Sequence, residues 1–274
     1  MEFRKPGPVY SALVGKAARA RLPVPLRGPA YRAFARAVGA DLGEAELDLR
    51  AYVTLGDLFA RRLRPGARTL DTDPRAIPSP CDGVVAAVGT ADHGAMIQAK
   101  GLDYQLEDLV VDRELAERLT GGAYATIYLS PRDYHRVHTP VDARIVHYDY
   151  VPGALWPVNP RVASRRERLL VRNERVVIAL DAGPLGTVAV VMVGASGVGN
   201  IALTYAPESV HWRAAGELRR VEVDQPVSRG DELGAFRLGS TVVMIFQPGA
   251  VELTGEVGQA VRFGERIGLA SEVA

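Results

Sequence analysis

The stretch "RLGSTVVMIF", residues 237–246, places a bare Gly-Ser step directly before an apolar run. Residues 241–246 are apolar after the initial threonine and rich in β-branched side chains, which predicts a short buried strand. In a purely structural protein, an ordinary turn would be enough to begin such a strand. The Gly239-Ser240 step therefore raises the hypothesis that this bond has a chemical purpose.

The pattern of short β-branched runs extends over the chain from residue 71 onward, and most runs end at Gly, Pro or Asp. Seven runs predict strands: "GVVAAVG", "YATIYLS", "ARIVHYDYV", "RVVIALDAG", "TVAVVMVG", "VEVDQPVSRG" and "STVVMIF". The stretch "DLVVDRELAERLTGG" predicts one short helix that ends at Gly121. We therefore expect an α+β fold in which N-terminal helices precede a mainly antiparallel β barrel or sandwich.

The segment before this β region predicts helices over residues 8–65. "YSALVGKAARA" and "AYRAFARAVGA" place apolar and basic residues at helical spacing. Thr54 is a suitable N-cap for the helix in "TLGDLFARRLRP", and Pro65 closes the segment. We expect a basic helical region, residues 1–66, followed by a β domain, residues 67–274.

Positive charge is concentrated at the N-terminus, although the 274-residue chain has a net charge of only +1. Residues 1–40 contain eight Lys or Arg against one Glu, a net charge of +7. A basic amphipathic region suits an anionic surface, either a membrane or nucleic acid. The alternatives are an ordinary solvated face and helices that simply pack on the domain.

One uncharged run, residues 182–207, is as long as a membrane-spanning helix. Its β-branched core "TVAVVMV" is only seven residues long, so the run predicts a buried strand followed by a glycine loop, and no transmembrane helix. Cys81 is the only cysteine. A single cysteine excludes an internal disulfide and a cysteine-based zinc cluster, and it fits a reducing compartment.

The block "YLSPRDYHRVHTP", residues 128–140, carries two histidines three positions apart. In an extended segment His135 and His138 point to opposite faces, whereas in a helical turn they share one. Without a nearby Cys or a helical frame, an HxxH pair is a weak metal signal, so no metal is expected. General acid–base chemistry is the better hypothesis, since histidine titrates near neutral pH. His147 lies in a predicted strand and is expected to be structural.

Asp82 and Ser240 complete a possible triad with one of these histidines. Asp82 lies in a Pro-rich turn, "SPCDGVV", where an ordinary Asp-Gly turn is the alternative. Asp82, His138 and Ser240 can converge so that Ser240 Oγ attacks a carbonyl carbon. The preceding residue, Gly239, has no side chain and leaves its own carbonyl open to that attack.

The glycine-rich stretch "VGASGVGNI", residues 193–201, follows a predicted strand. A dinucleotide-binding loop needs a helix after it, but "NIALTYAP" predicts another strand. The glycines are therefore expected to present backbone amides to a substrate pocket, or to form a tight turn: Gly194, Gly197 and Gly199.

Together these blocks resemble the bacterial-type phosphatidylserine decarboxylase proenzyme family. "SPCDGVV", "YLSPRDYHRVHTP", "VGASGVGNI" and "GDELGAFRLGSTVVMIF" are similar to that family's diagnostic blocks, in the same order and near the same spacing. "QAKGLDYQLEDLV", "VNPRVASRRERLLVRNERVVI" and "TLGDLFARRLRPGARTLDTDP" are similar as well, so the resemblance covers almost the whole chain. Two departures are Cys81, where the family usually has a small residue, and "ASG" at 195–197, which replaces Ala-Thr-Asn.

The resemblance implies that the chain cuts itself at Gly239-Ser240. In this family Ser240 would be activated by His138, itself oriented by Asp82, and would become an N-terminal pyruvoyl group, the covalent cofactor. The fragments, 1–239 and 240–274, would stay together as a heterodimer.

The resemblance also implies the reaction and its location. The pyruvoyl group would form a Schiff base with phosphatidylserine, release CO₂ and yield phosphatidylethanolamine, with His135 as the proton donor. Such a lyase of phospholipid biosynthesis would be a peripheral protein on the cytoplasmic side of the cell membrane, where the basic N-terminal region meets anionic lipid. A higher oligomer is possible, and no nucleic-acid partner is expected.

Three other classes of protein compete with this interpretation. A serine hydrolase with the same triad would act on an external ester or amide and would keep its own chain whole. A lipoyl-like carrier or an inactive lipid-binding module is suggested by "VSRGDELGAF", but a carrier needs a lysine at a hairpin tip, and no lysine follows Lys100. A nucleic-acid binder would need aromatic residues interleaved on its strands, which this chain lacks.

Overall fold

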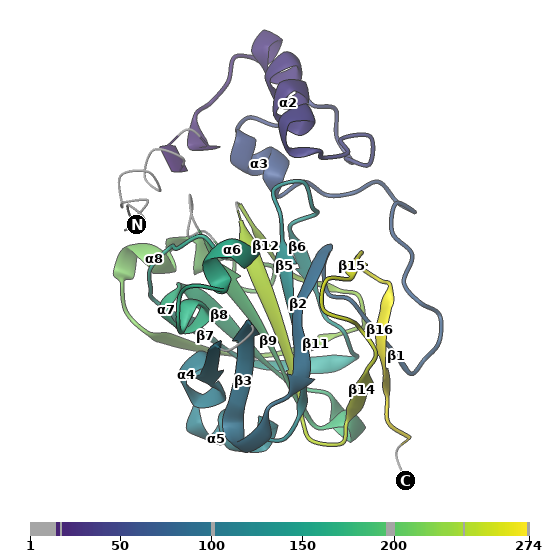
Figure 1. The fold of residues 1–274 in the computed structure, drawn as a ribbon. Helices are drawn as coiled ribbons and strands as arrows, with labels where there is room; N and C mark the ends of the chain where they lie inside the picture. The colour runs from purple at the N-terminus through teal and green to yellow at the C-terminus, as the bar shows by residue number, and fades with distance from the viewer. Residues whose placement is uncertain (1–14, 17, 100–101, 196–200, 238, 273–274) are drawn as a thin grey trace.

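A large antiparallel sheet carries the strand predicted at residues 241–246 near its centre (Figure 1). The computed structural model describes the whole chain except residues 1–14, 17, 100–101, 196–200, 238 and 273–274. Among the described residues this sheet has eight strands in the order β11-β7-β8-β9-β13-β5-β2-β15. Their bounds are Arg219–Val227 (β11), Ala143–Val151 (β7), Arg175–Asp181 (β8), Thr187–Gly194 (β9), Ser240–Phe246 (β13), Ala123–Leu129 (β5), Gly83–Thr90 (β2) and Ala260–Val261 (β15). The seven predicted strands are all present, and each pairing in the sheet is antiparallel.

Strand β13 is buried on both faces, which explains its continuous apolar sequence. All seven of its residues are buried. Val242, Met244 and Phe246 belong to the core on one face of the sheet, and Val243 and Ile245 belong to the core on the other. Side chains alternate between the faces along a strand. Because both faces are covered here, no alternation of apolar and polar residues appears.

Two small sheets pack against the first of these faces. They are β10-β12-β6, with strands Ile201–Leu203, Glu232–Phe236 and Arg136–His138, and β1-β16-β14, with strands Ala76–Pro78, Arg266–Ala270 and Val251–Leu253. Val137, Leu233 and Ile267 from these sheets share a core with Val242. In the part of the chain that the structure describes, no pairing joins the edge strands β11 and β15. The expected α+β fold with mainly antiparallel strands is confirmed, whereas closure into a barrel is not found among the described strands.

Short helices and a two-stranded antiparallel sheet cover the second face. The elements are β3 (Ala95–Ala99), β4 (Leu102–Gln105), α4 (Leu106–Val110), α5 (Arg113–Leu119), α6 (Pro160–Ala163) and α7 (Leu169–Arg172). The prediction of one helix in "DLVVDRELAERLTGG" is wrong, because Val111 adopts left-handed angles (φ 53°) and Asp112 caps a new helix, α5. Four further short helical elements connect the strands: η1 (Asp92–Gly94), η2 (Gly183–Leu185), η3 (Pro207–His211) and α8 (Trp212–Ala215).

The N-terminal region contains two helices of more than one turn in its described part. Helix α2 (Val24–Val38) ends at Gly39, which adopts left-handed angles (φ 77°), and helix α3 (Leu55–Phe59) follows a loop. Residues 40–53 are not helical, so the prediction of helix across 8–65 was too broad. The beginning of that prediction lies outside the described residues.

Thr54 caps α3, as predicted. Its hydroxyl accepts a hydrogen bond from the amide of Asp57, and the Asp57 carboxylate accepts one from the amide of Thr54, both at 3.1 Å. This reciprocal pair is a capping box, which satisfies two amides that the helix itself cannot. Helix α3 ends at Phe59, well before Pro65.

None of the described helices has the length and apolar composition that a bilayer crossing requires. The apolar core of residues 182–207 forms the buried strand β9, as predicted. The glycine loop expected after it falls on residues 196–200, which are outside the described residues.

We predict that Thr54→Ala lowers the free energy of unfolding by about 1 kcal/mol, because the substitution removes the acceptor for the Asp57 amide. Thr54→Ser keeps a hydroxyl at that position and should lose much less. Urea denaturation of the two variants measures the difference. Equal stabilities of the Ala and Ser variants would show that the capping box does not stabilise the protein.

Candidate active site

Ser240 is the first residue of β13 and lies at one end of the large sheet. It pairs with Gly194 of β9 on one side and with Leu129 of β5 on the other, and it is completely buried. Among the described residues, a Cβ atom added to the preceding residue, Gly239, would meet Ala195 Cβ at 3.9 Å, an ordinary contact distance. The serine is therefore held on both sides by its neighbouring strands.

His135 is the histidine that contacts Ser240. Its Nδ1 atom lies 3.2 Å from Ser240 Oγ, and its Nε2 atom lies 3.0 Å from the carbonyl oxygen of Ser130. Because a carbonyl oxygen can only accept, the proton of the neutral imidazole is on Nε2 and is donated to Ser130. Nδ1 then carries the lone pair and accepts the hydrogen bond from the Ser240 hydroxyl. This is the arrangement of a serine with its general base.

His135 stays neutral at physiological pH because it is buried. Burial lowers its pKa to about 3; the hydrogen bond to Ser130 opposes this shift, and the Arg61 guanidinium adds to it. The ring of Phe59, from α3, lies 4.3 Å from the His135 ring, centroid to centroid, and shields it from water. The lone pair on Nδ1 is therefore available to Ser240 at neutral pH.

His138 makes its hydrogen bonds in a second cluster. Its Nδ1–H group donates to the carbonyl oxygen of Gly230 at 2.8 Å, and its Nε2 accepts from the hydroxyl of Tyr134 at 3.0 Å. Its ring stacks on Phe263 with 3.7 Å between centroids. Both ring nitrogens are thus engaged by groups outside the predicted triad.

Asp82 lies beside this second cluster and is paired with Arg68. Arg68 Nε donates to Asp82 Oδ1 at 3.0 Å and Arg68 Nη2 to Oδ2 at 2.5 Å, while the amide of Phe263 donates to Oδ1 at 2.8 Å. Phe263 therefore links Asp82 to His138 through its amide and its ring. Among the described residues, Asp82, His138 and Ser240 are not hydrogen-bonded to one another. Their joint role in cleavage stays a prediction.

Several residues at the site were not singled out from the sequence. Ser130 and Tyr134 lie within the block 128–140, so closeness to the two histidines was a usable signal. The others come from distant parts of the chain and carry no local signal, because only folding brings them to the histidines and Asp82: Phe59, Arg68 and Phe263.

Gly194 is the one predicted pocket glycine within the described residues. It pairs with Ser240, its amide donates to the carbonyl of Glu174 at 2.8 Å, and its own carbonyl accepts from the Asn173 side chain at 2.9 Å. Its polar backbone atoms are therefore engaged within the fold. Gly197 and Gly199 lie outside the described residues, and a role of these three glycines at a substrate pocket stays a prediction.

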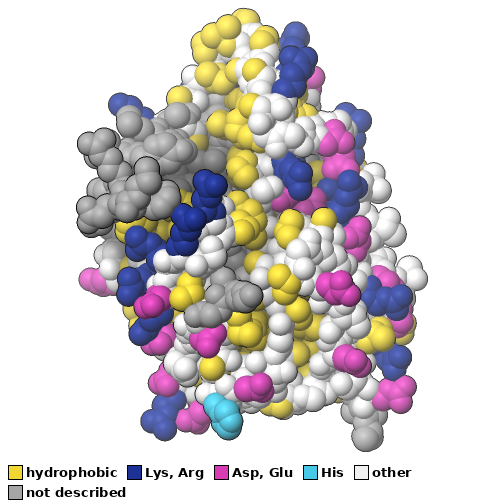
Figure 2. Space-filling view, viewed as in Figure 1, with side chains coloured by type: hydrophobic (Ala, Val, Ile, Leu, Met, Phe, Trp, Pro, Cys, Tyr) yellow, Lys and Arg dark blue, Asp and Glu magenta, His cyan; other side chains and the backbone are white. Residues whose placement is uncertain are grey.

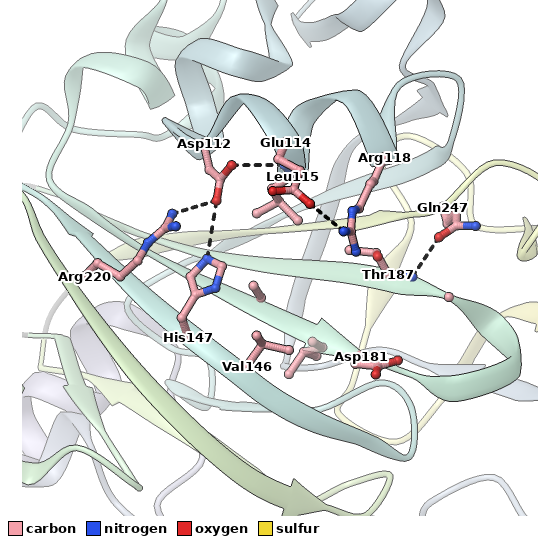
Figure 3. Close-up of a pocket in the computed structure, with 13 residues that line it drawn as sticks. Asp112, Glu114, Leu115, Arg118, Val146, His147, Asp181, Thr187, Arg220 and Gln247 are labelled. Carbon is pink, nitrogen blue, oxygen red and sulfur yellow. Dashed lines mark hydrogen bonds and ion pairs between the residues drawn. The ribbon is translucent and has the colours of Figure 1, made fainter.

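A separate polar cluster surrounds His147 on the helix-covered face of the sheet (Figure 3). It borders a cavity of about 550 Å³. Arg220 Nη2 donates to the carboxylates of Asp112 and Asp149, at 2.6 Å each, and His147 Nε2 lies 3.7 Å and 3.4 Å from the same two carboxylates. Asp112, His147 and Asp149 are close enough to share a metal ion. However, the Arg220 guanidinium already donates hydrogen bonds to both carboxylates, which supports a structural role for His147.

A buried serine that follows a glycine and donates to a neutral histidine defines a site for nucleophilic chemistry at the serine. Comparison with known proteins identifies the family. The profile of the phosphatidylserine decarboxylase family matches residues 55–269. The chain belongs to the phosphatidylserine decarboxylase family, as its sequence blocks predicted.

Individual relatives match over nearly their full length. The chain is 45% identical over 268 residues to the phosphatidylserine decarboxylase proenzyme of Anaeromyxobacter sp. (strain K); this alignment covers 96% of the chain and 94% of the relative. It is 42% identical over 266 residues to the phosphatidylserine decarboxylase proenzyme of Myxococcus xanthus (strain DK1622); this alignment covers 96% of the chain and 95% of the relative. The similarity thus extends over nearly the full length of both proteins.

The neutral state of His135 predicts a loss of stability in acid. In the unfolded chain this histidine takes up a proton near its ordinary pKa of 6.5, whereas in the folded chain it does so only near its pKa of about 3. Between these values the unfolded state binds more protons, so the free energy of unfolding decreases as the pH falls through this range. In an uncleaved background, Ser240→Ala, the further change His135→Phe should flatten this decrease. Urea denaturation at several pH values measures it, and an unchanged pH dependence would contradict the assignment.

Proposed function

We propose that this chain is a phosphatidylserine decarboxylase proenzyme that cuts its own backbone between Gly239 and Ser240. The hydrogen bond from Ser240 Oγ to His135 Nδ1 carries the proposal, because it supplies a base to the hydroxyl that follows the Gly239 carbonyl. The family membership supports the substrate and the reaction, since the relatives are named phosphatidylserine decarboxylase proenzymes.

Cleavage begins when Ser240 Oγ attacks the carbonyl carbon of Gly239. His135 takes the hydroxyl proton, the C–N bond breaks and the proton passes to the freed amino group of Ser240, so that an ester replaces the amide. Loss of the Ser240 Cα proton then breaks the Cβ–Oγ bond, and Gly239 leaves as a carboxylate. The remaining dehydroalanine tautomerises to an imine, and water displaces its nitrogen as ammonia. Residue 240 is then a pyruvoyl group, so the residues at the site fit the cofactor of this family.

We assign the base of this step to His135, whereas the sequence predicted His138 oriented by Asp82. His135 Nδ1 is 3.2 Å from Ser240 Oγ. For His138 Nε2 to act as the base, it has to give up its hydrogen bond from Tyr134. In our proposal, Asp82 and His138 position the segment that carries His135.

The same histidine suits the second reaction. The pyruvoyl ketone supplies a carbonyl that binds the substrate amine and accepts the electron pair left by CO₂. His135 contacts residue 240, so it is within reach to hold and deliver the proton that replaces the carboxylate. Burial of both residues, with Phe59 beside the imidazole, limits the access of bulk water to the site. An apolar site favours loss of CO₂, because the negative charge of the carboxylate disperses as the bond breaks.

The two fragments, 1–239 and 240–274, are expected to remain together as a heterodimer. In the smaller fragment, β13 pairs with β5 and β9, β15 pairs with β2, and β16 pairs with β1. These strand pairings do not depend on the bond before Ser240, so the packed sheets should persist after it breaks. Assembly into a higher oligomer stays a prediction.

Residues 1–66 are proposed to hold the protein on an anionic membrane, as a peripheral protein on the cytoplasmic side. Helix α2 leaves Val24 51% and Leu26 57% exposed, and it also exposes Arg32 and Arg36. Figure 2 shows apolar and basic side chains together at this end of the molecule. Apolar side chains enter the bilayer interface while arginines meet anionic headgroups. No nucleic-acid partner is proposed.

We predict that Ser240→Ala abolishes both self-cleavage and decarboxylation, because it removes the nucleophile and the source of the ketone. Intact-mass spectrometry should show one whole chain for the variant. The wild type should give two fragments, and the smaller should begin with a pyruvoyl group. A decarboxylase-active wild type with a whole chain and an unmodified Ser240 would refute the proposal; a whole chain that hydrolyses esters would favour the serine hydrolase.

His135→Ala and His138→Ala distinguish the two assignments of the base. We expect His135→Ala to slow self-cleavage by on the order of 100-fold or more, and His138→Ala to slow it by less than about tenfold, since that change acts only through positioning. Gel analysis of freshly synthesised chains gives both rates. Rapid cleavage of the His135 variant together with an uncut His138 variant would overturn our assignment and support the triad of Asp82, His138 and Ser240.

A further inference from the structure

A run of arginines lies at the same end of the large sheet as Ser240. The chain leaves β7 at Val151, forms α6 and α7, and returns as β8 at Arg175. Arg175 pairs with Val193 of β9, and Val193 pairs with Thr241 of β13. Helices α6 and α7 therefore belong to the rim around the Ser240 end of the sheet.

The charge of this part of the rim is positive. Residues 161–172 contain five arginines against one glutamate, a net charge of +4 in a chain whose total is +1. Arg168 pairs with Asp108 at 2.7 Å, and Arg166 lies 3.6 Å above the Trp156 ring. Three arginines of this segment have exposed side chains, whatever contacts they make within the fold: Arg161, Arg165 and Arg172.

An exposed apolar side chain belongs to the same rim. Leu218 is 60% exposed in the turn between α8 and β11. The next residue, Arg219, pairs with Tyr150 at the Ser240 end of β7. Arg213 of α8 forms an ion pair with Glu174, which follows α7 closely. The turn with Leu218 is thus joined to the arginine-bearing segment.

We infer that this surface, the arginine rim (Arg161, Arg165, Arg172 and Leu218), binds the anionic phospholipid bilayer that contains the substrate. The inference rests on the proposed function, because a lipid substrate requires the Ser240 end of the sheet to face a bilayer. Figure 2 shows basic side chains gathered on the flank where α6 and α7 lie in Figure 1. Exposed arginines are attracted by anionic headgroups, and an exposed leucine can enter the interface beside them.

The leucine favours a bilayer over nucleic acid as the partner. Phosphate and sugar contacts account for most binding to a nucleic-acid backbone, and they reward arginine but offer little to an exposed apolar side chain. At a bilayer surface both kinds of side chain contribute. The arginine rim is also separate in sequence from α2. Contacts of both α2 and the rim with the membrane would fix the orientation of the domain, whereas α2 alone would leave the domain free to rotate about that helix.

The test compares two triple variants with the same change in net charge. The rim variant combines three substitutions: Arg161→Gln, Arg165→Gln and Arg172→Gln. The control variant neutralises exposed arginines of α5 and β7: Arg113→Gln, Arg118→Gln and Arg144→Gln. Co-sedimentation measures binding to phosphatidylcholine vesicles that contain phosphatidylglycerol, an anionic lipid that is not the substrate, and to pure phosphatidylcholine vesicles.

At low salt we expect the partition coefficient of the rim variant onto anionic vesicles to fall on the order of 100-fold below that of the wild type. The partition coefficient of the control variant should fall by less than about tenfold. The difference should shrink at high salt, because salt screens the arginines. Leu218→Ser should weaken binding at high salt as well, because insertion of an apolar side chain is not screened. Wild-type binding by the rim variant, or equal losses in both triple variants, would overturn the inference.

Self-cleavage and decarboxylation of detergent-dispersed phosphatidylserine are measured on the same proteins. The rim variant should retain both, since the rim residues are not part of the site around Ser240. A wild type that neither cleaves nor decarboxylates would refute the proposed function, which is a different result from unchanged vesicle binding. If the rim variant lost affinity for duplex DNA but not for vesicles, the surface would belong to nucleic-acid binding and the inference would be overturned.

Discussion

The hydrogen bond that the Ser240 hydroxyl donates to His135 Nδ1 exists because three parts of the chain meet at one end of the large sheet. Strand β13 is paired on both sides and buried on both faces, which fixes Ser240. The Ser130 carbonyl fixes the imidazole proton on Nε2, and Phe59 of α3 shields the ring. Burial then keeps the histidine neutral, so its lone pair faces the hydroxyl. A solvent-exposed serine and histidine at the same distance would exchange this contact for water.

In our proposal, the same burial lets the protein break its backbone without losing its fold. A strand held by hydrogen bonds to two neighbours and by apolar contacts on two faces does not need the bond at its beginning. The N-terminal helices are connected to the same site. The ring of Phe34 in α2 lies 6.2 Å from the ring of Phe59 in α3, and the Phe59 ring lies against His135. In our proposal, the helix that meets the bilayer is thus connected through two aromatic rings to the histidine that reacts.

Much of this protein was predictable from local sequence. The strands follow from short β-branched runs, and the Thr54 cap follows from a Thr-x-x-Asp spacing, because both depend on neighbouring residues alone. The candidate nucleophile was identified in the same way, from a Gly-Ser step before a buried strand. Predictions that depend on longer-range geometry did less well. A helix break at Val111 divides a segment that was predicted as one helix, and the non-helical loop after Gly39 lies in a region that was predicted to be helical. Closure of the sheet depends on edge strands far apart in sequence.

The sequence by itself determined three things: the family, the two candidate histidines, and the strand that begins at Ser240. Each of these is contained in a contiguous block of sequence. Only the tertiary structure decided which histidine meets the serine. His138 ends β6 and His135 directly precedes it, and their imidazoles contact different groups. Which imidazole turns toward β13 depends on how β6, in another sheet, packs on the large one, and that information is spread over the whole core. The partners of Asp82 were not predictable for the same reason. Arg68 and Phe263 come from distant segments that only folding brings to Asp82.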